Sequence, residues 1–460
     1  MFVGRTRELE MLEGAYQARR SAFVPIYGRR RVGKSELILR FLQGKPGIYY
    51  LGKTAPAQLQ LREFLREAAR VTGEPLLAEL ATDDWKQALL AAVDRWRGDG
   101  KLVLVLDEFQ WIAGASPELP SILQECWDRH WRDSGRVVLI LCGSFVGFME
   151  RTVLGKSSPL FGRRAAQIFL KPFSYREAAR FHPGWSSADH ARAYFVCGGV
   201  PLYLRMFDAA RSIEKNIEHA LLDEFAPLFR EPDFLLREEL RDVESYYAVL
   251  RAIASGHVSA RAIAANAALP ERSLHYYLQQ LSELGYVRRR HPLTGARPAA
   301  RIVRYTLEDP LLRFWFRFVF PNTSFLQQMG ARRALAERIR PELDAYWGSC
   351  FERLCREALG SVYEREGMST AFEVGEYWDK ETQIDLVSVR DDGWIDLGEC
   401  KWGAVKSLPA LARELEAKVA RYPNPRNATV GRRFFLRHLR KGERPEVSNA
   451  SWHSLDDLYA

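Results

Sequence analysis

The first chemistry-bearing segment of the chain is residues 28–35, GRRRVGKS, which match the phosphate-binding pattern GxxxxGK[ST]. An apolar run at 23–27 precedes it and an amphipathic run at 36–42 follows, as a strand–loop–helix unit requires. Glycines let backbone N–H groups approach phosphates, and a helix N-terminus adds partial positive charge. Lys34 would contact the terminal phosphates, and the Ser35 hydroxyl would bind Mg²⁺. The pattern predicts ATP as a cofactor, with contacts from Gly28, Arg29, Arg30, Arg31, Val32, Gly33, Lys34, Ser35 and Glu36.

Two adjacent carboxylates, Asp107 and Glu108, follow the strongly apolar run at 101–106. Ligands of open α/β sheets bind at the carboxyl ends of the strands, so this pair would lie beside the phosphate-binding loop. Asp107 is expected to hold the metal, and Glu108 to polarise a water for attack on the γ-phosphate. The structural alternative is an acidic pair that caps the following helix.

Two later positions are candidates for contacts with the γ-phosphate. Ser144 follows the apolar run at 136–142 and would be a polar sensor, unless it only caps the helix expected at 145–151. In the segment FGRR at 161–164, either Arg163 or Arg164 would reach the nucleotide of a neighbouring subunit, as arginine fingers do. That role implies a homo-oligomer formed through the ATPase domain, and a solvated basic turn is the alternative.

The first half of the chain resembles the archaeal-type branch of the AAA+ and STAND ATPases, which also occurs in bacteria. The resemblance is carried by FVGRTREL at 2–9, YGRRRVGKS at 27–35, LVLDEFQW at 104–111, SPLFGRR at 158–164 and GGVPLYL at 198–204, together with the strand before Ser144. In that family the opening box and the GGxP turn flank the adenine. The resemblance therefore implies base contacts from Val3, Gly4 and Pro201.

Near the C-terminus, Asp385 and Glu399 are expected to face each other across a β-hairpin. The strands at 384–389 and 394–401 flank a three-residue loop, Asp-Asp-Gly, at 391–393. Centring that loop pairs Val389 with Ile395, Val387 with Leu397 and Asp385 with Glu399, whose Cβ atoms would be about 5 Å apart. Strand alternation brings Lys401 to the same face. Two carboxylates and a lysine predict a Mg²⁺ site for phosphodiester chemistry, and a partly buried salt bridge is the alternative.

Asp385 with Glu399-x-Lys401 also resembles the core of PD-(D/E)XK nucleases, in which these three residues are the catalytic set. The segments at 373–379, 383–389 and 398–402 are similar to the C-terminal domain commonly joined to archaeal-type ATPases. The resemblance implies that Glu352, on the preceding helix, is an auxiliary metal ligand. Ile384 stands where the signature has proline.

Between these regions, residues 244–307 show three short helical patterns, at 246–254, 260–267 and 271–284, and then a basic tail. This order predicts a winged helix-turn-helix that binds DNA, and a protein interface is the alternative. The groove-facing residues would be Arg272, Ser273, His275, Tyr276 and Gln279. The wing would offer Arg288, Arg289, Arg290, His291, Arg297, Arg301 and Arg304 to phosphates.

The elements that must position these residues follow a recognisable rhythm. Apolar runs alternate with amphipathic stretches over 21–170, which predicts a parallel sheet covered by helices, and 174–239 is helical with breaks near 198–201. The aromatic run at 309–320 would pack a connection. We expect an α/β chain with a P-loop ATPase core (1–173), a helical lid (174–239), a winged helix (240–308), an aromatic connector (309–329) and an α/β restriction-endonuclease-like domain (330–460).

The bulk composition sets the outer bounds. The chain has 460 residues, a net charge of +9 and a pI of about 9.2, so a polyanionic partner such as DNA is plausible. Its six cysteines lack CxxC spacing, which indicates buried free thiols in a reducing compartment. No apolar stretch approaches the ~18 residues that span a bilayer, so we expect no membrane contact and a cytoplasmic protein. The sequence predicts an ATP-dependent protein that acts on DNA, and its rival is a nucleotide-dependent switch whose nuclease-like domain only binds.

Overall fold

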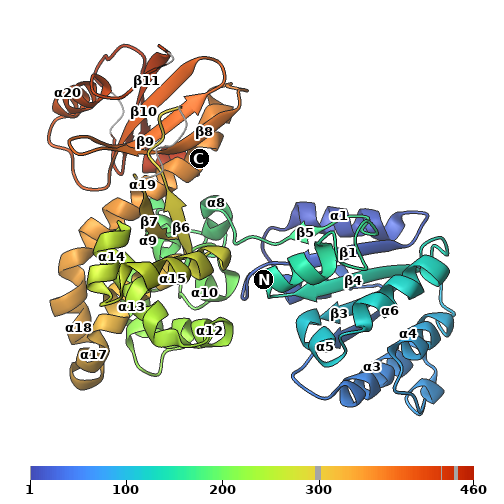
Figure 1. Ribbon diagram of the computed structural model, residues 1–460. Helices are drawn as coiled ribbons and strands as arrows, with labels where there is room; N and C mark the ends of the chain where they lie inside the picture. The colour runs from blue at the N-terminus through green and yellow to red at the C-terminus, as the bar shows by residue number, and fades with distance from the viewer. Residues whose placement is uncertain (1, 296–301, 426, 440–443) are drawn as a thin grey trace. The chain divides into compact units, whose positions relative to one another are not determined.

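The computed structural model describes residues 2–295, 302–425, 427–439 and 444–460 (Figure 1). By compactness the chain divides into two units. Unit 1 comprises Met1–Phe173 with Val200–Leu202, and unit 2 comprises Ser174–Gly199 with Tyr203–Ala460. The expected division into five parts is finer than this and stays a prediction.

Unit 1 is built on a five-stranded parallel sheet, as the alternating pattern predicted. Its strands have the order β2-β3-β4-β1-β5. Every residue of β1, β3 and β4 is buried, because helices cover both faces of the sheet. The strands are β1 (Ala22–Tyr27), β2 (Gly47–Leu51), β3 (Leu102–Asp107), β4 (Val137–Gly143) and β5 (Ile168–Phe169).

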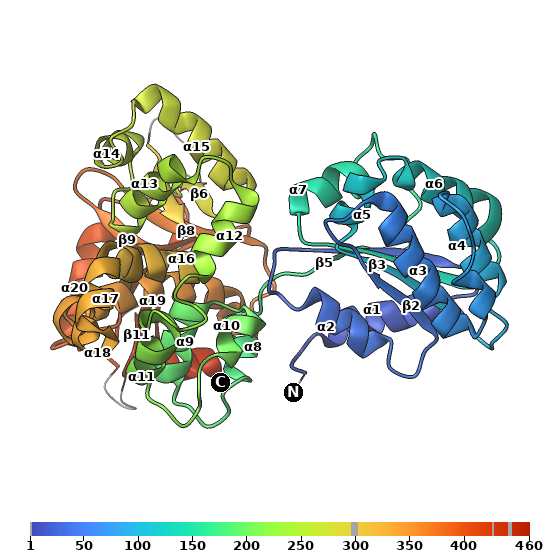
Figure 2. The ribbon, with the colours of Figure 1, turned by 90° about the horizontal axis from the view of Figure 1, so that it is seen from below.

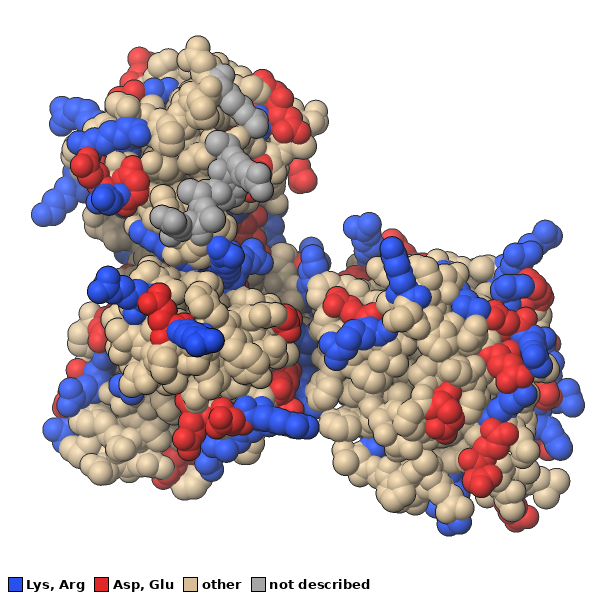
Figure 3. Space-filling view, viewed as in Figure 1, with Lys and Arg blue, Asp and Glu red and all other residues tan. Residues whose placement is uncertain are grey.

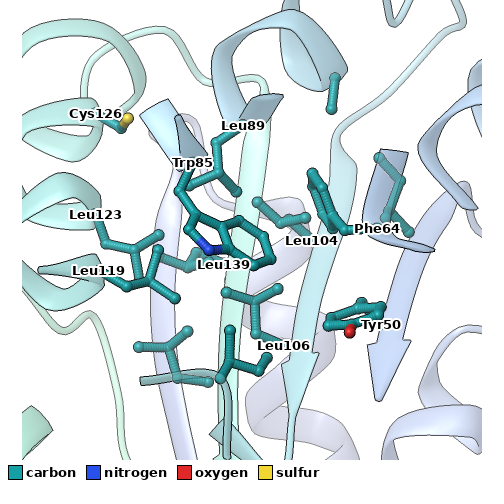
Figure 4. Close-up of a cluster of buried hydrophobic side chains, with 14 of the residues drawn as sticks. Tyr50, Phe64, Trp85, Leu89, Leu104, Leu106, Leu119, Leu123, Cys126 and Leu139 are labelled. Carbon is teal, nitrogen blue, oxygen red and sulfur yellow. The ribbon is translucent and has the colours of Figure 1, made fainter. Parts of the chain in front are cut away.

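Helices lie against both faces of this sheet and make two cores. One face packs on Trp85, Phe64 and Leu123 around Leu104 and Leu139 (Figure 4). The opposite face packs the first two helices onto alternate residues of the same strands. The helices are α1 (Thr6–Gln17), α2 (Lys34–Phe41), α3 (Ala57–Thr72), α4 (Trp85–Asp94), α5 (Phe109–Ala115), α6 (Leu119–Cys126) and α7 (Val146–Met149), with short turns η1 (Pro75–Leu77), η2 (Trp127–Trp131) and η3 (Glu150–Leu154).

Unit 2 begins with the helical stretch that the sequence predicted over 174–239. Side-chain caps start several of these helices, including Ser174, Ser186 and Ser212, whose hydroxyls accept backbone N–H groups of the first turn. The elements are α8 (Tyr175–Ala179), α9 (Ser187–Cys197), α10 (Pro201–Arg205), α11 (Ile213–Ile217), η4 (Glu218–Leu222) and α12 (Glu231–Glu239).

Three helices and a two-stranded sheet follow, close to the predicted ranges. The last helix buries Leu274, Leu278 and Leu281, the one apolar face that its spacing indicated. The elements are α13 (Val243–Ala254), α14 (Ala260–Asn266), α15 (Glu271–Glu283), β6 (Val287–Arg290) and β7 (Arg304–Leu307), and the two strands pair antiparallel.

The aromatic run is helical and packed, which confirms that it is no free linker. Phe314, Phe316 and Phe318 are fully buried, and the Trp315 indole N–H donates to the carbonyl of Phe229 at 2.7 Å. A long helix then leads to the C-terminal sheet (Figure 2). The elements are α16 (Pro310–Phe314), η5 (Trp315–Val319), η6 (Phe320–Asn322), α17 (Thr323–Met329), α18 (Ala331–Ala334), η7 (Leu335–Ile339) and α19 (Arg340–Arg365).

The C-terminal sheet has the order β12-β11-β10-β9-β8. The predicted hairpin register is confirmed for Val389 opposite Ile395 and Val387 opposite Leu397, and Gly393 takes the left-handed conformation (φ 86°) in the turn. Two further strands, which the sequence analysis did not identify, extend the sheet in parallel. The elements are β8 (Phe372–Trp378), β9 (Gln383–Arg390), β10 (Trp394–Lys401), α20 (Leu408–Val419), β11 (Thr429–Leu436), β12 (Ala450–Ser454) and α21 (Leu455–Tyr459).

The composition predicted buried free cysteines and no segment that spans a membrane. All six cysteines are free and buried, which confirms the expectation of buried free thiols. Over the residues that the structure describes, no helix has both the length and the apolar character needed to cross a bilayer.

Candidate functional site

The phosphate-binding loop joins the end of β1 to the start of α2. At Gly28 a Cβ atom would lie 2.3 Å from the Leu170 carbonyl oxygen, so only glycine fits there. Gly33 caps α2 with a positive φ of 92°. The Lys34 ammonium donates to the loop carbonyls of Gly28 at 2.9 Å and Arg29 at 3.0 Å, and burial lowers its pKa. The loop therefore holds a buried cation against its own backbone, where a phosphate anion would compensate for the lost solvation.

Asp107, at the end of β3, lies directly beside this loop. Its Oδ2 atom accepts hydrogen bonds from the Ser35 hydroxyl at 2.7 Å and from the Tyr49 hydroxyl at 2.5 Å. Burial and the Asp107 charge raise the pKa of Tyr49, so its hydroxyl remains a donor. The Ser35 hydroxyl and the Asp107 carboxylate together form an oxygen set that suits Mg²⁺. Tyr49 was missed from the sequence because it lies in an ordinary apolar strand.

Glu108, the next residue, adopts the left-handed backbone conformation (φ 48°). Its Oε2 atom accepts hydrogen bonds from the Ser144 hydroxyl at 2.7 Å and from the Gln110 amide, and these two partners are 3.1 Å apart. Phe145 occupies the N-cap position of α7, so the alternative that Ser144 caps this helix is wrong. Glu108 occupies the N-cap position of α5, but its side chain makes no capping hydrogen bond to that helix, which does not support the capping alternative for Glu108.

The opening segment of the chain is bound to the phosphate-binding loop. Val3 is buried, and Gly4 has a positive φ of 63°. The Arg5 guanidinium donates to the carbonyls of Val32 at 3.2 Å and Lys171 at 2.7 Å. A Cβ atom on Gly33 would lie 3.8 Å from a ring carbon of Pro201, so the GGVP turn adjoins the loop as well.

The two candidate finger arginines differ in their surroundings. Arg163 makes several hydrogen bonds to Asp128, the shortest 2.6 Å, and it lowers the pKa of that carboxyl. Arg164 is exposed. Arg163 would have to leave Asp128 to reach a nucleotide on another subunit, so the geometry favours Arg164.

The predicted carboxylates of the C-terminal domain converge in the structure. Asp385 lies on β9, and Glu399 and Lys401 lie on β10. The Lys401 ammonium is 2.6 Å from Glu399 Oε2 and 3.8 Å from Asp385 Oδ2. A second lysine, Lys418 of α20, is 2.5 Å from Glu399 Oε1. Glu399 is completely buried, so each of its oxygens is neutralised by a different lysine.

Glu352, on α19, belongs to the same electrostatic cluster. Burial and the neighbouring Asp385 carboxylate raise its pKa to about 8. One helical turn later, Arg356 donates to the backbone carbonyl of Asp385 and lies 4.0 Å from Glu376. The sequence analysis named neither Lys418 nor Arg356, because both come from helices whose packing on the sheet no local pattern shows.

The cluster does not form a metal cage in this conformation. Within the described parts of the chain, no three His, Cys, Asp or Glu side chains are arranged to hold a metal ion. The ion pairs also fit the salt-bridge alternative. A cation could bind between Asp385 and Glu399 only after the Lys401 ammonium turned away from Glu399.

Most of the residues that were predicted to face a DNA groove are exposed on α15. Arg272, His275, Tyr276 and Gln279 are exposed, whereas the Ser273 hydroxyl donates to the Pro270 carbonyl at 2.9 Å. The predicted wing residues differ in their surroundings. Arg288 and Arg289 of β6 are exposed, whereas Arg290 pairs with Glu308 at 3.2 Å. His291, which follows β6, is partly buried, and the Arg304 guanidinium of β7 lies 4.5 Å from the centre of the Trp378 ring. Arg297 and Arg301 lie outside the described residues.

Comparison with known proteins fits the geometry of unit 1. Residues 2–207 match a family described as an ATPase domain predominantly from Archaea. This part of the chain is thus similar to archaeal-type ATPase domains. Residues 315–412 match a second family, described as archaeal and bacterial proteins of unknown function.

Similar proteins come from archaea. An uncharacterised protein of Methanocaldococcus jannaschii is 29% identical over 424 residues, which cover 91% of this chain and 92% of that protein. An uncharacterised ATP-binding protein of the same organism is 49% identical over 45 residues, 10% of this chain and 76% of that protein. Among solved structures, a Walker-type ATPase of Pyrococcus abyssi has a TM-score of 0.48 at 20% identity and covers 69% of this chain and 96% of that one. The Aeropyrum pernix ORC2 protein also has a TM-score of 0.48, at 16% identity, and covers 71% of this chain and 95% of that one.

Proposed function

We propose that this chain binds and hydrolyses ATP with Mg²⁺ and uses the cycle to act on DNA. The observation that carries the proposal is the 2.7 Å contact between the Ser35 hydroxyl and Asp107, which joins the phosphate-binding loop to the acidic strand end. Lys34 would bind the β- and γ-phosphates, and Ser35 with Asp107 would hold Mg²⁺. When bound, the ion neutralises charge on the phosphates. Glu108, oriented by Ser144 and Gln110, would take a proton from the attacking water.

The test separates binding from hydrolysis. Lys34→Ala should abolish ATP binding, because it removes the cation that faces ground-state phosphates, and Glu108→Gln should keep binding while hydrolysis falls at least ~100-fold. Lys53→Ala is the matched control, because Lys53 is exposed and pairs with Glu63 at 2.7 Å. Binding would be followed with a fluorescent ATP analogue and hydrolysis by phosphate release. Equal nucleotide affinity in Lys34→Ala and the unmodified chain would refute the site.

The DNA part of the proposal rests on α15 and on the exposed arginines of β6. Arg272 and Tyr276 are exposed on the helix, and Arg288 and Arg289 on the strand. Their charges suit phosphates and their polar groups suit base edges. Replacing Arg272 and Arg289 together by alanine should weaken DNA binding and reduce the slope of log K against log salt by about 2.

The control for this test is Arg332→Ala, which removes an exposed arginine from α18, outside the proposed DNA surface. Binding would be measured by fluorescence anisotropy over a range of salt concentrations. An unchanged slope in the double variant would assign α15 to a protein partner and favour the switch over the DNA-acting protein.

A second candidate activity is metal-dependent cleavage of phosphodiester bonds at Asp385, Glu399 and Lys401. The specific observation in its favour is their convergence in a buried cluster that Glu352 also joins. Asp385 and Glu399, with Glu352 as an auxiliary ligand, would hold Mg²⁺, which would stabilise charge on the scissile phosphate when bound. Lys401 would orient the attacking water.

A further inference from the structure

A second cluster of basic side chains in unit 2 surrounds a pocket of about 380 Å³. Five arginines line it: Arg288 and Arg290 from β6, Arg313 from α16, and Arg353 and Arg356 from α19. Figure 1 shows β6, β7 and α19 next to one another, and in the same view Figure 3 shows Lys and Arg side chains gathered at this level of unit 2. We call this feature the arginine pocket.

The carboxylates near the arginine pocket do not balance its positive charge. Glu308 accepts all three of its ion pairs from pocket arginines, at 3.4 Å from Arg288, 3.2 Å from Arg290 and 3.3 Å from Arg353. Burial alone would raise the pKa of Glu308, but these arginines lower it to about 2. One carboxylate is thus shared by three cations.

The other carboxylates near the pocket either accept hydrogen bonds from residues other than the pocket arginines or form only long ion pairs with them. Glu376 lies 3.9 Å from Arg290 and 4.0 Å from Arg356. Glu357, which also lines the pocket, accepts hydrogen bonds from the Tyr194 hydroxyl at 2.9 Å and from the backbone N–H of Tyr175 at 3.3 Å.

Arg313 has a buried donor atom without an acceptor. Its Nε atom is buried without a hydrogen-bond partner, and it forms no ion pair in the described part of the chain. Its Nη1 atom donates to the Leu307 carbonyl at 3.3 Å, and Arg353 donates to the same oxygen at 3.2 Å. A buried donor with no acceptor is costly, so Arg313 is set to receive an anionic acceptor from a ligand.

We propose that the arginine pocket binds the phosphate group of a ligand. Planar guanidinium groups arriving from three elements can donate to several oxygens of one tetrahedral anion, and their excess positive charge suits a dianion. The phosphate could come from a free phosphorylated small molecule or from the terminal phosphate of a nucleic acid strand. Because β6, α16 and α19 all contribute, a bound phosphate would tie these elements together. This site is separate from the ATP site of unit 1.

The experiment uses the full chain carrying Lys34→Ala, so that the phosphate-binding loop does not compete. Inorganic pyrophosphate is titrated calorimetrically, and a short single-stranded oligonucleotide with either a 5′-phosphate or a 5′-hydroxyl is followed by anisotropy. Arg313→Gln and Arg353→Gln should each weaken binding at least ~tenfold, which corresponds to about 1.4 kcal/mol. Arg365→Gln, on the same helix α19 but outside the pocket, should bind like its parent.

Each outcome bears on the proposal. Binding of pyrophosphate alone identifies a small-molecule site, whereas tighter binding of the 5′-phosphorylated strand, displaced by pyrophosphate, identifies a strand end. Arg313→Gln keeps the test valid if Arg353→Gln fails to fold, since Arg313 is in no ion pair. Absence of binding by every probe, or unchanged affinity in folded Arg313→Gln, would overturn the proposal while leaving the ATPase assignment intact.

Discussion

At the scale of single residues, the centre of the ATP site is a carboxylate that serves two hydroxyl donors. Asp107 accepts from Ser35 and from Tyr49 through the same oxygen. The Ser35 contact follows from the known motif, but the Tyr49 contact does not. Because Tyr49 donates to Asp107, it restrains the carboxylate that we propose as a metal ligand. Tyr49 is thus a positioning residue.

The matching prediction concerns Tyr49→Phe. Loss of a hydrogen bond to a charged group costs about 1.5–3 kcal/mol, so ATP hydrolysis should fall at least ~tenfold and require more Mg²⁺, while the nucleotide still binds. Tyr50→Phe is the control, because the Tyr50 hydroxyl donates to Gln60 at 3.4 Å and not to Asp107. Hydrolysis would be measured over a Mg²⁺ titration. Identical titrations for Tyr49→Phe and the unmodified chain would show that the contact has no role.

At the scale of elements, the C-terminal centre depends on helices packed on a hairpin. The hairpin brings Asp385 and Glu399 together, but α20 supplies Lys418 and α19 supplies Glu352 and Arg356. Glu399 is buried and takes a lysine on each oxygen. Removing one partner of such a group is destabilising, because the remaining charge is left undercompensated.

The prediction at this scale uses Lys418→Met. The variant should be less stable by about 2 kcal/mol, since Lys418 is only partly exposed. If Asp385 and Glu399 form a cation site, added Mg²⁺ should raise the melting temperature of the variant more than that of the unmodified chain. Lys380→Met, at an exposed position between β8 and β9, should show neither effect. A destabilised variant that ignores Mg²⁺ would support the salt-bridge alternative.

At the scale of the whole molecule, two chemical centres lie in different units of one chain. The ATP site belongs to unit 1, and the carboxylate cluster, α15 and the arginine pocket belong to unit 2. The chain passes from one unit to the other near Ser174 and twice more around Val200–Leu202, within the GGVP turn region. Pro201, which adjoins Gly33, lies in this short segment of unit 1.

Separation of the two centres yields a further prediction. Asp385→Asn should abolish metal-dependent cleavage of nucleic acid while ATP hydrolysis stays within about twofold, because Asp385 belongs to unit 2 and the phosphate-binding loop to unit 1. Lys401→Ala should bind the metal and still fail to cut. The assay compares several DNA and RNA substrates with and without ATP. If the unmodified chain cuts none of them with Mg²⁺, the result favours the rival proposal, a nucleotide-dependent switch whose C-terminal domain only binds.

Much of this protein follows from local sequence. The apolar runs at 23–27, 101–106 and 136–142 identified the three central strands of the first sheet, because a buried parallel strand needs continuous hydrophobicity. Turn chemistry placed the hairpin at 391–393 and its register, because strand pairing alternates with a fixed period of two. The loop at 28–35 was identified by residue type and spacing alone.

Tertiary structure decided the partners that come from distant segments. Tyr49 contacts Asp107, Lys418 contacts Glu399, and five arginines from three elements line one pocket with Glu308. The strands β11 and β12 were not identified because polar and aromatic residues are mixed in them, and they are defined by pairing, β11 with β10 and β12 with β11. The local pattern of apolar and polar residues indicates which side of its helix or strand a residue occupies. The pairing of charged side chains from distant segments depends on how the elements pack. Packing is a long-range property that no short segment encodes by itself.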